Sequence, residues 1–147
     1  MAVYLRGATI EDGVDILEWR NDPATRQNSY TKEVISLNSH MNWFQKKLAD
    51  GNCHIFILMD DDKKAGNIRV DVSDSLGEIS YMIAPGARGR GLGKKILALV
   101  EKELPASVTA LTGMVLKTNK ASEKCFLANG YTSEDAGDSL CFSKTIH

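Results

Sequence analysis

The chain has 147 residues, of which 43% are hydrophobic and 25% charged, with 12 Gly and 3 Pro. This composition excludes a disordered, collagen-like or low-complexity protein, and the length is typical of one domain that buries roughly 70% of its unfolded surface. We therefore expect a single domain over residues 1–147. The 18 Lys and Arg residues nearly balance the 19 Asp and Glu residues, so the net charge of −1 does not favour general binding to nucleic acid.

Cysteine usage and hydropathy indicate where the protein works. Cys53, Cys125 and Cys141 form no CxxC pair and leave one thiol over, which favours a reducing compartment, so we expect a cytoplasmic protein. No apolar run approaches the roughly 20 residues needed to span a bilayer. The start of the chain lacks a basic segment followed by an apolar one, so neither a membrane span nor a secretion signal is expected.

The first third of the chain predicts one strand and two helices. Residues 3–8 predict a short strand, and residues 9–20 a helix capped by Thr9, with apolar residues at Ile10, Val14 and Leu17. Residues 21–35 are polar and lack a period, which predicts a surface loop that can hold one helical turn. Residues 36–51 predict a second helix, whose core face is formed by Leu37, Met41, Phe44 and Leu48.

The remainder of the chain predicts further strands that alternate with helices. The apolar run at residues 54–59 predicts a buried strand, and Asp60 to Asp62 a solvated turn. Period-2 alternation predicts two more strands, which we expect to be antiparallel. The expected elements are strands at 67–72 and 78–83, a helix at 92–103, a strand at 108–116, a helix at 119–130 and a strand at 140–146.

A glycine-rich turn, Pro85-Gly-Ala-Arg-Gly-Arg-Gly-Leu-Gly-Lys-Lys95, lies where a strand ends and a helix begins. The first N–H groups of a helix have no partner inside the helix, the helix dipole adds partial positive charge, and glycines let a phosphate approach the backbone. Four cations stand in this turn although the whole chain carries a net charge of −1. The turn therefore predicts a phosphorylated ligand.

Spacing excludes two kinds of phosphate site. A P-loop needs a Gly five residues before the Gly93-Lys94 pair, and the chain has Arg88 there. A dinucleotide fingerprint that begins at Gly89 or Gly91 needs a final Gly at a position that holds Lys94 or Ile96. Neither a nucleoside triphosphatase nor a dinucleotide-binding domain is expected.

The pattern Arg88-x-x-Gly91-x-Gly93, at a strand-to-helix junction, resembles the signature of the GCN5-related N-acetyltransferases (GNAT superfamily). The resemblance implies an α+β fold: a central, mixed, mostly antiparallel twisted sheet of six to seven strands, flanked by about four helices. It also implies acetyl-CoA as cosubstrate, with its pyrophosphate on backbone N–H groups of the turn. The alternative is a turn that only joins two elements. The implied cofactor-binding residues are Met82, Ile83, Arg88, Gly89, Arg90, Gly91, Leu92, Gly93, Lys94, Asn119, Ser122 and Phe126.

A later segment, from Lys117 to Ser122 and on to Gly130-Tyr131, is also similar to this family. In the family, an Asn after the fifth strand reaches the cofactor arm, which is Asn119 here. A plain helix N-cap is the alternative role for Asn119, and the two roles are compatible.

The family's chemistry is direct attack of an amine on the thioester, which needs a neutral amine. A lysine-like amine is neutral in only about one molecule in 2,500 at pH 7, so a general base matters. Glu78 can accept the proton directly or through a water held by Ser80. Many relatives carry the acid one position earlier, at Gly77 here, and the alternative for Glu78 is a solvated strand residue.

Two further catalytic demands are the protonation of the departing thiolate and the polarisation of the carbonyl. Many relatives place a Tyr on the last helix for the first demand, and this chain has Phe126 there. Tyr81, Tyr131 or solvent can substitute, and the sequence favours none of them. For the second demand, the resemblance implies that a backbone N–H near Met82 or Ile83 polarises the carbonyl of the thioester.

Other reactive residues have simpler explanations. Cys125 stands beside Phe126 on a predicted helix with no His near it in the sequence, so a buried side chain is favoured over an acyl-enzyme nucleophile. His40 and His54 lack partners at ligand spacing, so no metal site is expected. Trp43 and Phe44 are expected in the core.

Acceptor choice in this fold is made by the first loop and helices. Here residues 19–30 and 40–44 resemble N-acetyltransferases that act on nucleotide-linked 4-amino sugars in nonulosonic (pseudaminic) acid pathways, and more distantly ribosomal-protein N-terminal acetyltransferases. Arg20 and Arg26 could bind a diphosphate as bidentate partners, or could form surface ion pairs. The expected substrate-binding residues are Arg20, Asn21, Arg26 and His40.

Three functions follow as hypotheses. The first is an acetyl-CoA-dependent N-acetyltransferase whose acceptor is a small amine, a 4-amino sugar linked to a nucleotide carrier. The second is an enzyme that acts on protein N-termini, and the third a CoA-binding module without catalysis, which the Phe126 replacement makes conceivable. We expect a monomer or a homodimer.

Overall fold

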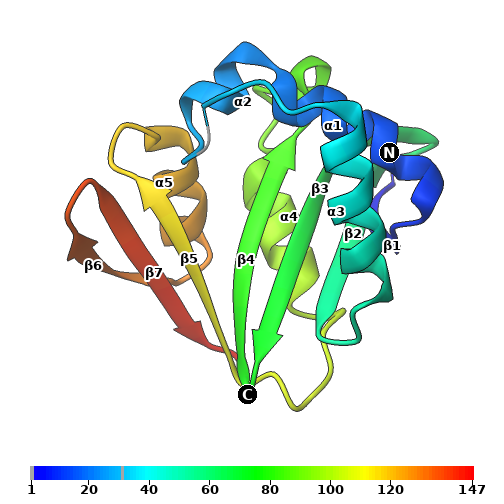
Figure 1. Cartoon of the computed structure of the whole chain (residues 1–147). Coiled ribbons are helices and arrows are strands. Elements are labelled where there is room, and N and C mark those ends of the chain that lie inside the picture. The colour runs from blue at the N-terminus through cyan, green and yellow to red at the C-terminus, as the bar shows by residue number, and fades with distance from the viewer. Residues whose placement is uncertain (1, 31) are drawn as a thin grey trace.

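The computed structural model describes residues 2–30 and 32–147, so Met1 of the expected domain and Thr31 of the expected loop lie outside the described residues. Seven strands form one sheet in the order β1-β2-β3-β4-β5-β7-β6 (Figure 1). Described neighbours are antiparallel except β4 and β5, which are parallel. The strands are β1 (Val3–Gly7), β2 (Cys53–Asp60), β3 (Lys63–Ser73), β4 (Leu76–Ile83), β5 (Ala110–Leu116), β6 (Thr132–Ala136) and β7 (Ser139–Thr145).

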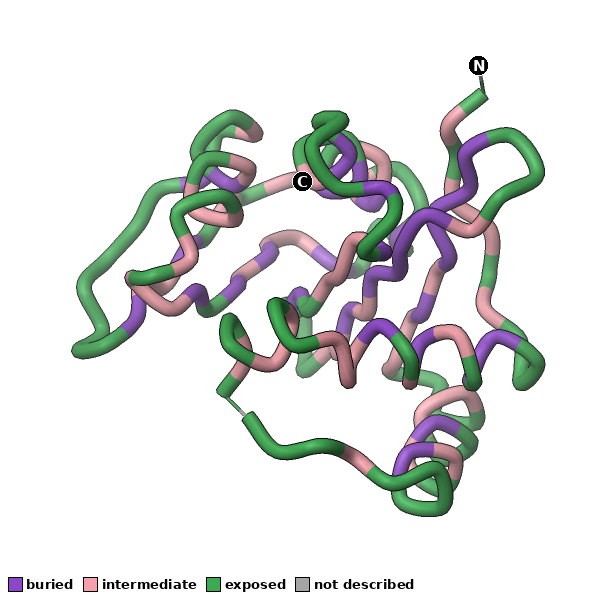
Figure 2. Tube along the Cα trace, turned by 90° about the horizontal axis from the view of Figure 1, so that it is seen from above, coloured by how far each residue is buried: buried purple, intermediate pink, exposed green. Residues whose placement is uncertain are grey.

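Helices cover both faces of this sheet (Figures 1 and 2). α1 (Gly13–Asn21), α2 (Pro23–Gln27) and α3 (Leu37–Ala49) lie on one side, and α4 (Leu92–Val100) and α5 (Lys120–Ala128) on the other. Two short 3-10 helices, η1 (Ile10–Asp12) and η2 (Pro85–Ala87), precede α1 and follow β4. The mixed, mostly antiparallel sheet and its flanking helices confirm the expected fold class.

Helix α3 begins where predicted, because the Ser36 hydroxyl accepts a hydrogen bond from the Ser39 amide at 3.2 Å. Its buried face is rotated from the predicted one. Leu37 is 55% exposed, whereas His40 is fully buried beside Phe44. A histidine can occupy this core position because its two ring nitrogens both have hydrogen-bond partners.

The prediction for the apolar face of the first helix was wrong. Ile10 and Val14 are exposed, while Ile16 and Trp19 are buried with the carboxylate of Asp12. Asp12 accepts two hydrogen bonds from the Arg6 guanidinium, at 2.8 and 2.9 Å, and pairs with Lys64 at 2.7 Å. Burial alone would raise the pKa of Asp12, but these partners and the Thr9 amide hold it well below its ordinary value.

Three other features differ from the sequence-based expectation: an additional strand, the end of a helix and the position of Asp60. Strand β6, whose five residues are all exposed, was not predicted, because an edge strand without a buried face has no period-2 apolar signal. The helix expected to reach residue 103 ends at Val100. Asp60, expected in a solvated turn, is the buried last residue of β2 and pairs with Arg90. The helical turn allowed in the first loop is α2.

Candidate active site

Strands β4 and β5 pair over only three residues. Leu76, Gly77 and Glu78 pair with Ala110, Leu111 and Thr112. Beyond this point the two strands diverge while each continues, as Figure 1 shows. Their facing edges make no ladder hydrogen bonds there within the described chain, so backbone groups remain available to a bound molecule.

The direction of the β4 amides follows from pairing with β3. The Ala84 amide donates to the Ala65 carbonyl at 2.8 Å, and hydrogen-bonded residues alternate along an antiparallel pair. The amide of Met82 therefore faces β3, whereas the amides of Tyr81 and Ile83 face the opening toward β5. Of the two amides expected to polarise a carbonyl, that of Ile83 is placed to do so and that of Met82 is not; Tyr81 supplies a second.

A cavity of about 470 Å³ lies beside the glycine-rich turn, and we call it the turn cavity. Gly89 and Gly91 have φ angles of 78° and 73°, in the left-handed region that favours glycine. Gly91 is the N-cap of α4 and has no side chain to bond the first amides. The amides of residues 92–94 have no acceptor among the described residues, and this end of the helix is therefore suited to an anion.

The predicted cofactor-binding residues divide into two groups. Those that line the turn cavity are Met82, Ile83, Arg88, Gly89, Gly91, Leu92, Gly93, Asn119 and Ser122. Three others do not line it: Arg90 is paired with Asp60, Lys94 is exposed, and Phe126 is buried in the core. Arg88 is anchored by Asp22 at 2.9 Å and Thr25 at 2.8 Å, which ties the turn to α2.

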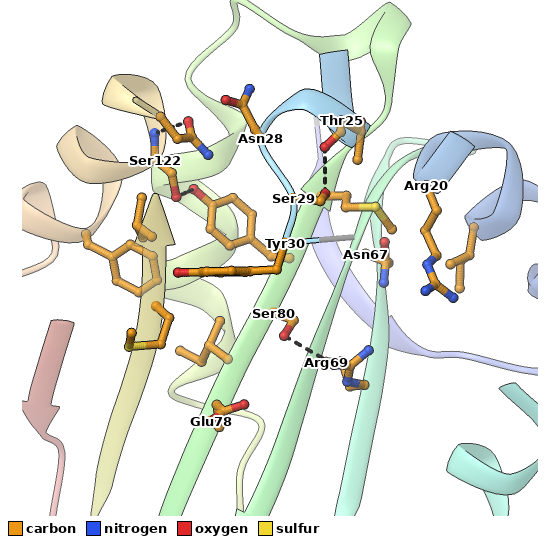
Figure 3. Close-up of a pocket in the computed structure, with 18 of the residues that line it drawn as sticks. Arg20, Thr25, Asn28, Ser29, Tyr30, Asn67, Arg69, Glu78, Ser80 and Ser122 are labelled. Atoms are coloured by element: carbon orange, nitrogen blue, oxygen red, sulfur yellow. Dashed lines mark hydrogen bonds between the residues drawn. The ribbon is translucent and has the colours of Figure 1, made fainter. Parts of the chain in front are cut away.

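A second cavity, of about 520 Å³, lies over β3 and β4 on the side of α1 and α3; we call it the sheet cavity (Figure 3). Glu78, Ser80 and Arg69 line it together with Trp43. The turn cavity and the sheet cavity share seven lining residues: Thr25, Asn28, Ser29, Tyr81, Met82, Asn119 and Ser122. The two cavities therefore meet where β4 and β5 diverge.

The alternation of β4 decides between two positions for a catalytic acid. Glu78 and Ser80 are on the face that lines the sheet cavity, and Arg69 of β3 donates to the Ser80 hydroxyl at 3.3 Å. Gly77 is buried on the other face, where an added Cβ would lie 2.7 Å from Val70 and 2.9 Å from Leu111. A carboxylate at position 77 would be forced into the core, so Glu78 is the acidic residue that β4 presents to the cavity.

Tyr81 joins β4 to α5 at the boundary between the cavities. Its hydroxyl lies 2.8 Å from that of Ser122. Burial raises the pKa of Tyr81 well above its ordinary value, so the phenol keeps its proton. The other tyrosine candidate, Tyr131, is buried and lines neither cavity.

Phe126 fills the position where the resemblance expected a tyrosine. It is 2% exposed, stacks on Phe142 with ring centroids 5.0 Å apart, and packs on Gly113, where a Cβ would lie only 2.6 Å from its ring. Phe126 is therefore a core residue that touches the edge of the sheet cavity. Cys125 lines the turn cavity, contrary to its expected full burial.

The four predicted substrate-binding residues do different things in the structure. Arg20 lines the sheet cavity. Asn21 and Arg26 line neither cavity: Asn21 bonds both main-chain groups of Ile35, and Arg26 donates to the carbonyls of Asn21 and Lys32. These two hold the first loop in shape.

His40 does not reach either cavity but supports a residue that does. Its Nε2 donates to the Gly13 carbonyl at 2.7 Å, since a carbonyl only accepts, so Nδ1 accepts from Arg20 at 3.0 Å. Burial lowers the pKa of His40, in keeping with this neutral ring. His40 is a positioning residue for Arg20.

Several residues that line the sheet cavity were not among the predicted site residues. They include Asn67 and Arg69, and also Tyr30 and Trp43, which were named only as parts of the segments expected to choose the acceptor. The Tyr30 ring lies across the sheet cavity (Figure 3), and its hydroxyl bonds that of Ser139 on β7. Trp43 was expected in the core, and Arg69 was counted only as the polar half of a strand. The one available signal was the alternation that puts Asn67 and Arg69 on the same face as Glu78.

The described residues contain no cluster of three His, Cys, Asp or Glu that could hold a metal ion. No helix in the described part of the chain is long and apolar enough to cross a membrane.

A family model for the acetyltransferase (GNAT) domain matches residues 2–132. A comparison with curated proteins gives no match. A spermidine N-acetyltransferase from Vibrio cholerae, solved with CoA and spermine, is similar in structure, with a TM-score of 0.88 and 14% identity over 97% of this chain and 95% of that one.

Two other solved structures are similar. A domain from Methanocaldococcus jannaschii has a TM-score of 0.85 and 22% identity, covering 98% of both chains. An aminoglycoside acetyltransferase, solved with coenzyme A and kanamycin, has a TM-score of 0.83 and 17% identity over 98% of this chain and 95% of that one. At these identities the likeness shows the fold.

Proposed function

Since the chain belongs to the acetyltransferase (GNAT) domain family and is an acetyl-CoA-dependent N-acetyltransferase, we propose that a primary amine bound in the sheet cavity attacks the thioester directly. The observation that carries this proposal is the meeting of the two cavities at the divergence of β4 and β5. An amine that enters from one side and a thioester from the other reach each other only there. We further propose that residues 1–147 work as one GNAT domain.

The turn cavity suits acetyl-CoA, which supplies the acetyl group as a thioester. The unpaired amides of residues 92–94 and the positive end of α4 would hold the diphosphate, and Gly89 and Gly91 allow the backbone to approach it. Arg88 adds positive charge while anchored to Asp22. The amides of Ile83 and Tyr81 face the opening and would polarise the acetyl carbonyl.

Two side chains would move the protons of the reaction. Glu78 accepts the proton that the amine releases as its nitrogen bonds to the carbonyl carbon, with Ser80 placed to hold an intervening water. As the carbon–sulfur bond breaks, the Tyr81 hydroxyl donates its proton to the leaving sulfur. Ser122, hydrogen-bonded to Tyr81, can relay a proton back from solvent.

For the finer acceptor class, we propose a 4-amino sugar on a nucleotide carrier. Arg20, which lines the sheet cavity, supports this choice, whereas Arg26, bound to main-chain carbonyls, does not. The alternative acceptor is a protein N-terminus. The three cysteines are free thiols, which is compatible with a cytoplasmic site of action.

The test is to incubate the protein with acetyl-CoA and pooled amines, including amino-sugar nucleotides and short peptides. Thiol release is followed together with acetylated products by mass spectrometry. Acetylated amino sugar supports the proposed acceptor, and acetylated peptide supports the alternative. CoA at 100 times its Kd should stabilise the fold by about 2.7 kcal/mol.

A further inference from the structure

Two guanidinium groups converge on one aromatic ring in the sheet cavity. The Cζ atoms of Arg20 and Arg69 lie 4.7 and 4.9 Å from the centroid of the Trp43 ring. The three residues come from α1, β3 and α3 and all line the cavity (Figure 3 labels the two arginines). Stacking on an aromatic face orients a guanidinium without consuming its N–H donors.

The positive charge of this pair is only partly neutralised. Arg69 bonds Asp71 at 2.8 Å, but the same carboxylate also pairs with Lys47 at 2.9 Å. Arg20 makes no salt bridge with any described residue; its polar side-chain partner is the neutral ring of His40. Burial and the nearby charge of Arg69 lower the pKa of Arg20, as expected for a cation without a counter-ion.

The surroundings of the pair add little negative charge. Glu78 is the one carboxylate among the described residues that line the sheet cavity. Asn67, 6% exposed, also lines it, and its Oδ1 has no hydrogen-bond partner among the described residues. The two guanidiniums are suited to bind the oxygens of a carboxylate or phosphate, whereas the Oδ1 of Asn67 can accept a hydrogen bond from the amine or a hydroxyl of the acceptor. Neither Arg20 nor Arg69 lines the turn cavity, so the cofactor does not account for them.

We propose that the Arg20–Trp43–Arg69 cluster is a subsite for an anionic group, carboxylate or phosphate, carried by the acceptor amine. The proposal rests on the proposed function and names its substrate class. The amine would lie toward Glu78 and the anionic group toward the two guanidiniums. A polycationic amine would meet two like charges at the same place and bind weakly. This chain would then differ in acceptor charge from the spermidine and aminoglycoside acetyltransferases whose fold it shares.

The test uses pairs of amines that differ by the anionic group: ethanolamine with O-phosphoethanolamine, and butylamine with 4-aminobutyrate, plus spermidine. The kcat/KM for each is measured by thiol release, with products identified by mass spectrometry. We expect kcat/KM to be at least tenfold higher for the anionic member of one or both pairs. The two pairs distinguish phosphate from carboxylate. A preference for spermidine, or a kcat/KM for the members without an anionic group that equals or exceeds that of their partners in both pairs, overturns the proposal.

Variants then assign the preference to the cluster. In Arg20→Gln and Arg69→Gln we expect the ratio of kcat/KM between the members with and without the anionic group to fall at least tenfold, mainly through KM. Lys46→Gln removes the same charge at an exposed position of α3 outside both cavities and should keep the ratio. Stabilisation by CoA, measured for each variant, shows that the fold is intact. An unchanged ratio in both cluster variants overturns the proposal.

The outcome also separates this proposal from the proposed function. If CoA does not stabilise the protein and no amine yields thiol, the proposed function fails. If CoA binds but no amine is acetylated, the anionic amines are titrated by calorimetry into the CoA-saturated protein. Binding that is weakened tenfold in Arg20→Gln supports the subsite, and absence of binding overturns it.

Discussion

The hydroxyls of Tyr81 and Ser122 lie 2.8 Å apart and connect β4 to α5 at the point where the two cavities meet. This contact places a phenol on the cavity boundary although the position on α5 expected to carry one holds the buried Phe126. The proposed proton donor therefore belongs to β4 rather than to α5. The effect of the Tyr81 hydroxyl on catalysis can be measured.

Replacing Tyr81 with Phe should lower kcat by about 10²-fold, because general acid catalysis typically contributes that much or more. The KM for acetyl-CoA should change little, since the ring that lines both cavities remains. Steady-state thiol release measures both constants. Ser122→Ala is the matched control and should cost less, because the Tyr81 proton is still present; a Tyr81→Phe enzyme with normal kcat would exclude this role.

Glu78→Gln should lower kcat by about 10²-fold at pH values between 6 and 9, because the amide has the same shape but cannot accept the proton of the amine. The rate of acetylated product formation measures the effect. Glu134→Gln, on the exposed strand β6, makes the same chemical change away from both cavities and should retain the normal rate. Equal rates for Glu78→Gln and the unmodified protein would remove Glu78 as base.

Gly91→Val should abolish the thermal stabilisation that CoA provides. The φ angle of 73° costs a residue with a side chain about 1–2 kcal/mol, and relaxation of this strain would turn the amides of the turn away from the diphosphate. Gly86→Val is the control, because Gly86 has no positive φ, open space around its Cβ and no place in the turn cavity. Stabilisation by CoA that persists in Gly91→Val would mean that the diphosphate binds elsewhere.

Asp12→Asn should lower the free energy of unfolding at pH 7 by about 2 kcal/mol, since it removes a buried carboxylate from Arg6 and Lys64, which are themselves about one-third exposed. The pKa of Asp12 is lower in the folded protein than the ordinary value of about 3.9, so its contribution is complete above that pH and is lost as the pH falls below it.

Urea unfolding at pH 7, 4 and 3 checks this expectation: the difference between the two proteins should shrink as the pH falls below about 4. Asp15→Asn is the control, because Asp15 pairs with the same Lys64 at 2.8 Å but is 41% exposed, so its loss should cost less than about 1 kcal/mol. A difference that is constant with pH would show that the Asp12 charge is not the cause.

Local sequence patterns predicted most of the elements but not their buried faces. Ser36 caps α3 as predicted, since capping depends on residues three apart in the chain. Leu37 is exposed, and the buried His40 bonds Gly13 and Arg20, which belong to another helix. Strand β6 forms through pairing with β7 alone, and a segment that is polar except for Ala136 shows no sign of this in its own sequence.

The same division holds for the candidate site. The glycine-rich turn was predictable, because a helix start and the left-handed glycines before it are properties of consecutive residues. Asn21 and Arg26, predicted to bind substrate, instead bond the main chain of the first loop. Side-chain partners of this kind are chosen by the folded loop and leave no mark on residue spacing.

What the sequence by itself determined is therefore most of the order of elements and the glycine-rich turn before a helix, which follow from short-range periodicity and backbone geometry; the class of fold came from the family resemblance of that turn. Only the tertiary structure decided which residues meet in the sheet cavity. Arg20, Trp43 and Arg69 belong to two helices and a strand, and they converge because helix packing on the sheet and pairing of β3 with β4 bring distant segments together. The charge of such a cavity is a sum over long-range neighbours, which no local pattern contains.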